Sequence, residues 1–198
     1  MRRPCEYSWG NEVAYRNGTY VAFHAAGTTD PTASDIRYYN TLKMWSANKS
    51  IDFTLINSHE KTSAVRDSSQ RETLRRALVT RLNNSKHVVL IVTSLTKNDT
   101  DWVPFEIAHA VDECQIPIIA AYPDYDSILA PAQLSTYWPA ALASRIGNGS
   151  ARVMHIPFKM EPVLDAIDQF GVANKTYPTD GYGFYSRETH IQWGLIRP

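Results

Sequence analysis

The sequence of 198 residues is long enough for one well-packed core and too short for two full domains. Hydrophobic residues make up 43% and charged residues 20%, and the formal net charge of +0 gives no electrostatic reason to expect nucleic acid or an anionic membrane as a partner. Cys5 and Cys114 are too few for a disulfide framework. With no apolar run near the roughly 20 residues that span a bilayer, and no secretory signal, we expect a cytoplasmic single-domain protein.

Short apolar runs alternate along the chain with segments whose apolar residues recur every three or four positions. The runs are typical of buried strands and the segments of amphipathic helices. The strongest strand pattern covers residues 87–92, where a continuous apolar run predicts a central strand covered on both faces. Strands are predicted at residues 20–24, 51–56, 87–92, 116–121 and 151–156. Helices are predicted to start near residues 30–34, 69, 101 and 160, and one more helix is expected somewhere between residues 131 and 144.

This alternation predicts a parallel sheet with right-handed crossovers. For a domain of this size we expect a flavodoxin-like, three-layer α/β/α fold with five parallel strands in the order 2-1-3-4-5. The domain is assigned to residues 19–170, preceded by an N-terminal extension (1–18) and followed by a C-terminal tail packed on the domain (171–198). Ligands of such folds bind beyond the C-terminal ends of strands one and three, which places the loops 24–30 and 94–101 at the site.

One helix start next to this site stands out. Asp101 is a suitable N-cap residue, and Pro104 would lie in the first helical turn, where backbone N–H groups have no helical partner. Glu106 follows one turn into the helix, where the helix dipole favours a charged carboxylate. Trp102 lies four residues before it, on the same helix face. The stretch predicts either a ligand-binding anion or an ordinary acidic first turn, and the topology favours the first.

The chemistry of the ligand is narrowed by motifs that the sequence lacks. Neither the Rossmann glycine motif nor the Walker phosphate loop is present, and no His, Cys and carboxylate cluster has metal-ligand spacing, so we expect no metal. His24, at the end of strand one, is the only histidine predicted in the crevice. Arg71, Arg75 and Arg81 are interpreted as a solvated helix face rather than an anion site. A lone carboxylate without a metal suits chemistry at a sugar anomeric carbon.

At this point the sequence resembles a known family. The run of strand one, the loop after strand two and the Trp102-x-x-x-Glu106 pattern resemble Toll/interleukin-1 receptor (TIR) domains over roughly residues 19–121. More narrowly, the resemblance is to the TIR-like proteins of the Thoeris antiphage defence system. It is carried by Phe23-His24, Asp35-Ile36-Arg37, Trp45 and Trp102-Val103-x-x-Glu106-Ile107.

The resemblance implies an enzyme that cleaves the nicotinamide–ribose bond of NAD and makes a cyclic or otherwise modified ADP-ribose signal, which activates a separate effector. NAD is then the substrate, with no other cofactor, and self-association through TIR surfaces is expected. Glu106 matches the catalytic glutamate of enzymatic members. The loop 57–61, matching the BB loop of TIR domains, would cover the nucleotide or contact a neighbouring chain. The substrate-binding residues are predicted to be Phe23, His24, Ala25, Asp35, Arg37, Ser58, Ser94 and Trp102.

Two features leave alternatives open. Asp35 and Arg37 could form an ion pair that only braces the first helix. Ala25-Ala26 stands where many catalytic TIR domains have an aromatic residue or arginine, so the product is not implied by the resemblance.

Two other functions compete with the NAD-consuming enzyme. They are a non-catalytic TIR scaffold that signals by homotypic contacts and an enzyme resembling nucleoside deoxyribosyltransferases, which share the fold class and a catalytic glutamate.

Overall fold

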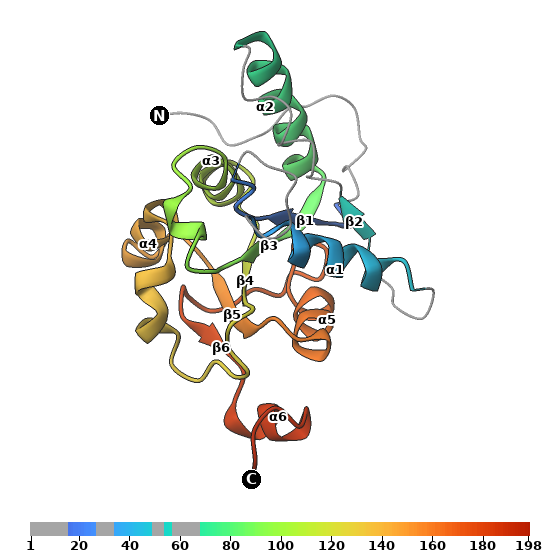
Figure 1. The fold of residues 1–198 in the computed structure, drawn as a ribbon, viewed down its shortest axis with the longest axis vertical. Helices are drawn as coiled ribbons and strands as arrows, with labels where there is room; N and C mark the ends of the chain where they lie inside the picture. Colours follow the sequence, from blue (N-terminus) through green and yellow to red (C-terminus); the bar gives the residue numbers. More distant parts are fainter. Residues whose placement is uncertain (1–15, 27–33, 49–53, 57–67) are drawn as a thin grey trace.

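The computed structural model describes residues 16–26, 34–48, 54–56 and 68–198. In this part of the chain, six parallel strands form one sheet in the order β2-β1-β3-β4-β5-β6, with helices on both sides (Figure 1). The predicted flavodoxin-like α/β fold and the order of its first five strands are confirmed. The prediction of five strands missed β6, which pairs with β5, so β5 is not the edge strand.

The strand positions agree with the apolar runs to within a few residues. β1 begins and ends two residues earlier than predicted, so that Phe23 and His24 follow the strand instead of closing it. Residues 51–53 of the second predicted strand lie outside the described residues. The strands are β1 (Gly18–Ala22), β2 (Thr54–Ile56), β3 (Ser85–Ile91), β4 (Ile118–Tyr122), β5 (Val153–Pro157) and β6 (Gly183–Phe184).

The helices follow each strand as expected, with two additions. α3 is prolonged by a turn of π-helix, η3 (His109–Glu113), so the helical segment ends before Cys114. α6 and β6 lie in the segment that was predicted to be a tail without elements. The helices are α1 (Ile36–Ser46), α2 (Ser68–Asn83), α3 (Trp102–Ala108), α4 (Ala140–Gly147), α5 (Met160–Gln169) and α6 (Arg187–Gln192), and the 3-10 turns are η2 (Thr96–Asn98) and η4 (Pro131–Tyr137). None of the described helices combines the length and apolarity that crossing a bilayer requires.

Each face of the sheet has its own apolar core, because successive side chains of a strand point to opposite faces. Tyr20, Ala22 and Leu90 pack with the buried residues of α2, α3 and α4. Val21 and Ile91 pack with those of α1 and α5 on the other face. Three leucines of α2, spaced four residues apart, are buried. They are Leu74, Leu78 and Leu82.

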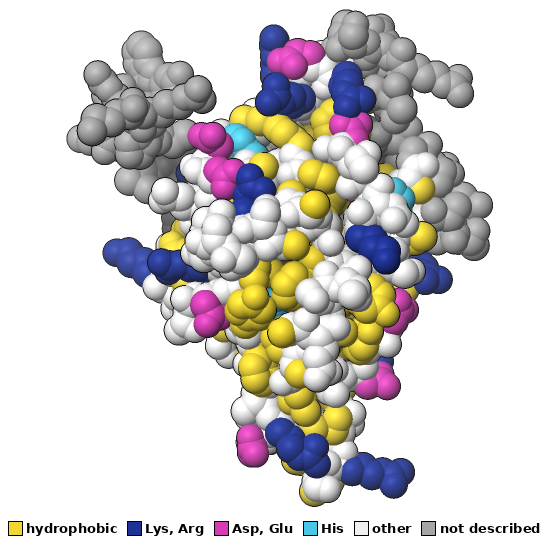
Figure 2. Space-filling view, turned by 90° about the vertical axis from the view of Figure 1, so that its left-hand side faces the viewer, with side chains coloured by type: hydrophobic (Ala, Val, Ile, Leu, Met, Phe, Trp, Pro, Cys, Tyr) yellow, Lys and Arg dark blue, Asp and Glu magenta, His cyan; other side chains and the backbone are white. Residues whose placement is uncertain are grey.

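Charged and apolar side chains are unevenly distributed over the α3–α4 side of the molecule. Figure 2 shows Lys and Arg gathered at the upper end of this side, where α2 lies in Figure 1. Apolar side chains gather on its lower half. Two large apolar residues beside and within β6, Tyr182 and Phe184, are exposed. The upper end therefore carries the arginines of α2 together with acidic side chains, and Figure 2 shows Lys and Arg at the lower end as well.

A buried polar chain ties the C-terminal segment to the sheet. The indole N–H of Trp138 donates to the Tyr122 hydroxyl (2.8 Å), which donates to Nδ1 of His155 (2.8 Å). His155 in turn donates from Nε2 to the Gly181 carbonyl (2.9 Å). This network satisfies polar groups that would be costly to bury unpaired. Sequence periodicity missed β6 because hydrogen bonding of this kind, and not an apolar pattern, holds its two residues in place.

His155 and His87 are both buried and neutral, so acid is expected to destabilise the fold. Burial lowers the pKa of His155 to about 4 and that of His87 to about 3, below the ordinary value of 6.5. Below pH 6.5 the unfolded chain therefore binds more protons than the folded one, and the free energy of unfolding decreases as the pH is lowered. We expect the free energy of unfolding to drop by about 2 kcal/mol per histidine between pH 6.5 and pH 5.

Urea unfolding at pH 7 and pH 5 measures this drop. His155→Gln should remove the share of one histidine from the pH dependence, whatever it does to stability at pH 7. Equal free energies of unfolding at the two pH values in the wild-type protein would contradict the prediction.

Candidate functional site

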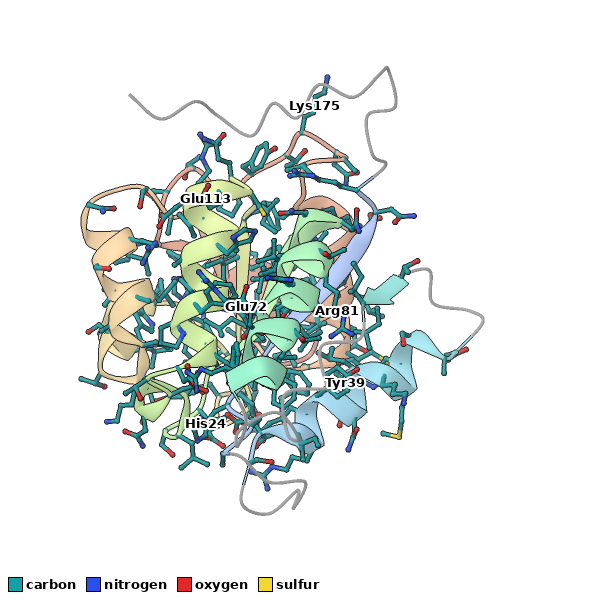
Figure 3. All side chains as sticks on the ribbon, turned by 90° about the horizontal axis from the view of Figure 1, so that it is seen from above. His24, Tyr39, Glu72, Arg81, Glu113 and Lys175 are labelled. Carbon is teal, nitrogen blue, oxygen red and sulfur yellow. The ribbon has the colours of Figure 1, made fainter. Side chains whose placement is uncertain are left out.

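The loops that follow β1 and β3 meet at the C-terminal edge of the sheet. The two strands are neighbours and run in parallel, with Ala22 opposite Leu90. Beyond them, Nδ1 of His24 lies 3.1 Å from Oδ2 of Asp99. Figure 3 shows His24 at the end of the molecule where α3 begins, with Glu113 at the far end of the same helical segment. The structure thus brings together the two loops that the topology predicted as neighbours.

Asp35, at the start of α1, closes this junction from the other side of the sheet. Its backbone N–H donates to the His24 carbonyl (3.0 Å), and the Thr93 hydroxyl lies 3.0 Å from both oxygens of its carboxylate. The Thr96 hydroxyl also donates to it (3.3 Å). Burial raises the pKa of Asp35, while the bonds from both threonines and the charge of His24 lower it. Asp35 is 2% exposed as a whole residue, and it holds together the loops that follow β1 and β3.

Arg37 does not form the ion pair with Asp35 that the sequence left open as a brace. Its guanidinium lies 4.6 Å from the centre of the Tyr38 ring and donates to the Tyr38 hydroxyl (2.7 Å). Arg37 is exposed, and its charge acts on Asp35 only as a lowering influence on the pKa of that carboxyl. The two residues therefore have different surroundings although they are two positions apart.

The side chain of Asp99, and not that of Asp101, caps α3. Oδ1 of Asp99 accepts from the backbone N–H groups of Asp101 (3.0 Å) and Val103 (3.2 Å), and the side chain of Asp101 makes no cap hydrogen bond. Asp101 instead pairs with Arg71 of α2. The prediction of Asp101 at the N-cap position is confirmed, but the side chain that caps the helix is that of Asp99, which reaches the free N–H groups from the loop before the helix. Pro104 lies in the first turn, as predicted.

Glu106 is buried on the inner face of α3. The whole residue is buried, and Oε1 of its carboxylate accepts a hydrogen bond from the hydroxyl of Tyr20 in the middle of β1. Burial and the negative charge of Glu106 raise the pKa of Tyr20 well above its ordinary value, against a lowering influence from Arg81 of α2. The carboxylate therefore has a fixed position between β1 and α3, held by a phenol that stays protonated.

Trp102 lies in a different environment from Glu106. It lines a cleft of about 330 Å³ between α2 and α3, where the Arg71 guanidinium lies 5.2 Å from its ring centre. One turn further on, Phe105 packs edge-on against Trp102 (6.4 Å between centroids) and lies beneath Arg75. These contacts hold α2 against the start of α3. The described contacts of Trp102 therefore support the start of α3, and its role in substrate binding stays a prediction.

The remaining predicted residues are scattered around the strand ends. Phe23 is buried and stacks on Tyr39 of α1 (5.3 Å), Ala25 is buried, and Ser94 is exposed after β3. Ser58 and the loop 57–61 lie outside the described residues. Within the described ranges, no three His, Cys, Asp or Glu side chains converge as metal ligands would.

Four residues of this site were not predicted from the sequence, namely Asp99, Thr93, Thr96 and Tyr20. Asp99 was detectable in principle, since Asp at the end of a loop before a helix is a common capping residue. Tyr20 and Thr93 gave no signal, because a hydrogen bond between residues far apart in sequence has no local pattern. Tyr20 was predicted only as part of the first strand, and Thr93 only as the residue after the third.

The family of the chain follows from comparison with known proteins. The family model described as "Thoeris protein ThsB, TIR-like domain" matches residues 20–128, more than half of the 198 residues. The match spans β1 to the loop after β4, and so includes His24, Asp99 and Glu106.

One solved structure, a conserved protein from Enterococcus faecalis V583, is similar with a TM-score of 0.46 and 20% sequence identity. The alignment covers 77% of this chain and 98% of the other. The family match alone, which takes in the Trp102-x-x-x-Glu106 pattern, places this protein: the chain belongs to the TIR-like domain family of the Thoeris defence protein ThsB.

Proposed function

We propose that this protein is a TIR-type NAD-consuming enzyme of antiphage defence. It cleaves the nicotinamide–ribose bond and converts the ADP-ribosyl part into a cyclic or otherwise modified nucleotide, which activates a separate effector. The observation that supports this proposal most is the position of Glu106. This carboxylate is fixed by Tyr20 on the helix that begins at the switch-point edge of the sheet, in a member of the ThsB family.

The chemistry needs little beyond such a carboxylate. Nicotinamide is a cationic group in NAD and leaves as a neutral molecule, so its departure requires no acid. The ribosyl carbon becomes positively charged in the transition state, and a preorganised anion lowers the energy of that state more than that of the substrate. Glu106 supplies the anion. The carboxylates of Asp35 and Asp99 near the same edge add to a negative potential that favours the cationic nicotinamide ring.

The proposal is tested by incubating the purified protein with NAD and measuring free nicotinamide by chromatography. The same protein is incubated with a deoxynucleoside and a second base, and self-association is followed in parallel. Release of nicotinamide supports the proposal. Exchange of bases with NAD untouched would replace it by a deoxyribosyltransferase activity. Antiphage protection by a protein that leaves both substrates intact, and keeps protecting with Glu106→Ala, would replace it by a scaffold.

Tyr20→Phe is expected to lower the rate of NAD conversion by about 100-fold while leaving the fold intact. The change removes only the hydroxyl that donates to Glu106, so the carboxylate loses its fixed position but keeps its charge. Nicotinamide release and the thermal midpoint are measured together. Tyr185→Phe, which removes a hydroxyl that donates to Asp165 on the other face of the sheet, is the matched control. A wild-type rate in Tyr20→Phe would show that the hydroxyl does not position Glu106.

A further inference from the structure

Asp99 holds the ring of His24 in one orientation. Its Oδ1 accepts hydrogen bonds from the N–H groups of Asp101 and Val103 at the start of α3. Its Oδ2 lies 3.1 Å from Nδ1 of His24. The side chains of His24 and Asp99 are 18% and 9% exposed. A carboxylate with both oxygens engaged in this way has little freedom to rotate. The imidazole at the strand end is therefore oriented by the same residue that caps the helix carrying Glu106.

The pairing also selects the tautomer of His24. An ionised carboxylate only accepts hydrogen bonds, so Nδ1 must carry the hydrogen and Nε2 holds the lone pair in the neutral ring. Asp99 is ionised at neutral pH: burial alone would raise its pKa, but the hydrogen bonds from His24, Asp101 and Val103 bring the pKa below its ordinary value. A histidine held by a carboxylate through Nδ1 is the arrangement that accepts protons at Nε2 in many enzymes.

We infer that His24 is the general base of the site and that Asp99 is its positioning residue, an inference that rests on the proposed function. The bond between the ribosyl carbon C1″ and nicotinamide breaks, and its electron pair leaves with nicotinamide. The oxygen of an acceptor hydroxyl, from water or a sugar, then forms a bond to C1″. The proton of that hydroxyl passes to Nε2 of His24 and from there to solvent.

The charges around His24 favour this proton transfer. Asp99 faces the ring from the loop before α3, and the Asp35 carboxylate acts on it electrostatically from the start of α1. Arg37 acts on Asp35 and so offsets part of its negative charge. Two nearby carboxylates stabilise the imidazolium that forms when Nε2 takes up a proton.

His24→Asn tests the base directly, because asparagine retains a donor toward Asp99 but cannot take up a proton. We expect the rate of NAD conversion to fall about 100-fold and the acidic limb of its pH profile to disappear. Azide, which attacks without losing a proton, should restore nicotinamide release in this variant. His109→Asn changes a histidine that bonds to Asn83 of α2 from the helical segment that carries Glu106, so it is the control and should keep the wild-type profile.

Asp99→Asn tests the positioning role, since asparagine can still cap α3 but does not carry the charge that fixes the tautomer. Nitrogen-15 NMR should find His24 with its hydrogen on Nδ1 in the wild-type protein and as a mixture of tautomers in Asp99→Asn. Asp101→Asn, which changes the neighbouring aspartate, is the control.

A wild-type rate and pH profile in His24→Asn, with nicotinamide release still lost in Glu106→Gln, would overturn the inference and leave the proposed function standing. An unchanged tautomer in Asp99→Asn would overturn the role of Asp99 by a measurement that needs no turnover. NAD left intact by the wild-type protein would overturn both proposals together.

Discussion

Glu106→Gln is expected to lower the rate of nicotinamide release from NAD by about 1000-fold. Glutamine has the shape of glutamate, and its side-chain oxygen can still accept from the Tyr20 hydroxyl. The charge opposite the developing ribosyl cation is lost, and that charge acts more strongly in the transition state than in the ground state. We therefore expect kcat to fall while KM changes little.

Glu113→Gln is the matched control for this substitution. Glu113 lies at the exposed end of the same helical segment, so its replacement removes a charge from that segment without touching the interior. It should keep the wild-type rate. Equal losses in Glu106→Gln and Glu113→Gln would mean that the total charge of the segment, and not a carboxylate at Tyr20, determines activity.

Leu90→Ala is expected to destabilise the protein by about 2–5 kcal/mol. Leu90 is fully buried in β3, which has a paired strand on each side, and it packs in the core beneath α2, α3 and α4. The neighbouring strands cannot move inward to fill the space, so a cavity remains after truncation. Chemical denaturation of the wild type and the variant measures the difference.

Leu95→Ala provides the comparison, because Leu95 is 39% exposed in the loop after β3. Its truncation should change the free energy of unfolding by less than about 0.5 kcal/mol. A loss of similar size at both leucines would contradict the assignment of β3 to the centre of the core.

The central fold could be predicted because its strands carry patterns that depend only on neighbouring residues. The apolar run of β3 indicates burial on both faces, and the leucine spacing of α2 indicates one buried stripe. β6 and α6 escaped prediction for the opposite reason. β6 is two residues long and is held by contacts with β5 and the chain around Gly181, which no local pattern records.

The features of the site also divide into those that the sequence could predict and those that it could not. Topology predicted a crevice at this edge of the sheet and led to His24 and Glu106, because helices and loops after parallel strands meet at one edge of the sheet. It could not say that Asp99 caps α3 while Asp101 pairs with Arg71, since both aspartates suit a helix start. Nor could it place Asp35 between two threonine hydroxyls, because that contact joins segments about 60 residues apart in sequence.

The central claim is that this member of the ThsB family converts NAD, with Glu106 as the catalytic carboxylate. The most direct measurement is mass spectrometry of the small molecules that form from NAD with the purified wild-type protein, before and after addition of extract from phage-infected cells. Free nicotinamide and a nucleotide with the composition of ADP-ribose or its cyclic form are expected, and both should be missing with Glu106→Gln. Intact NAD under both conditions, or the same products from Glu106→Gln, would contradict it.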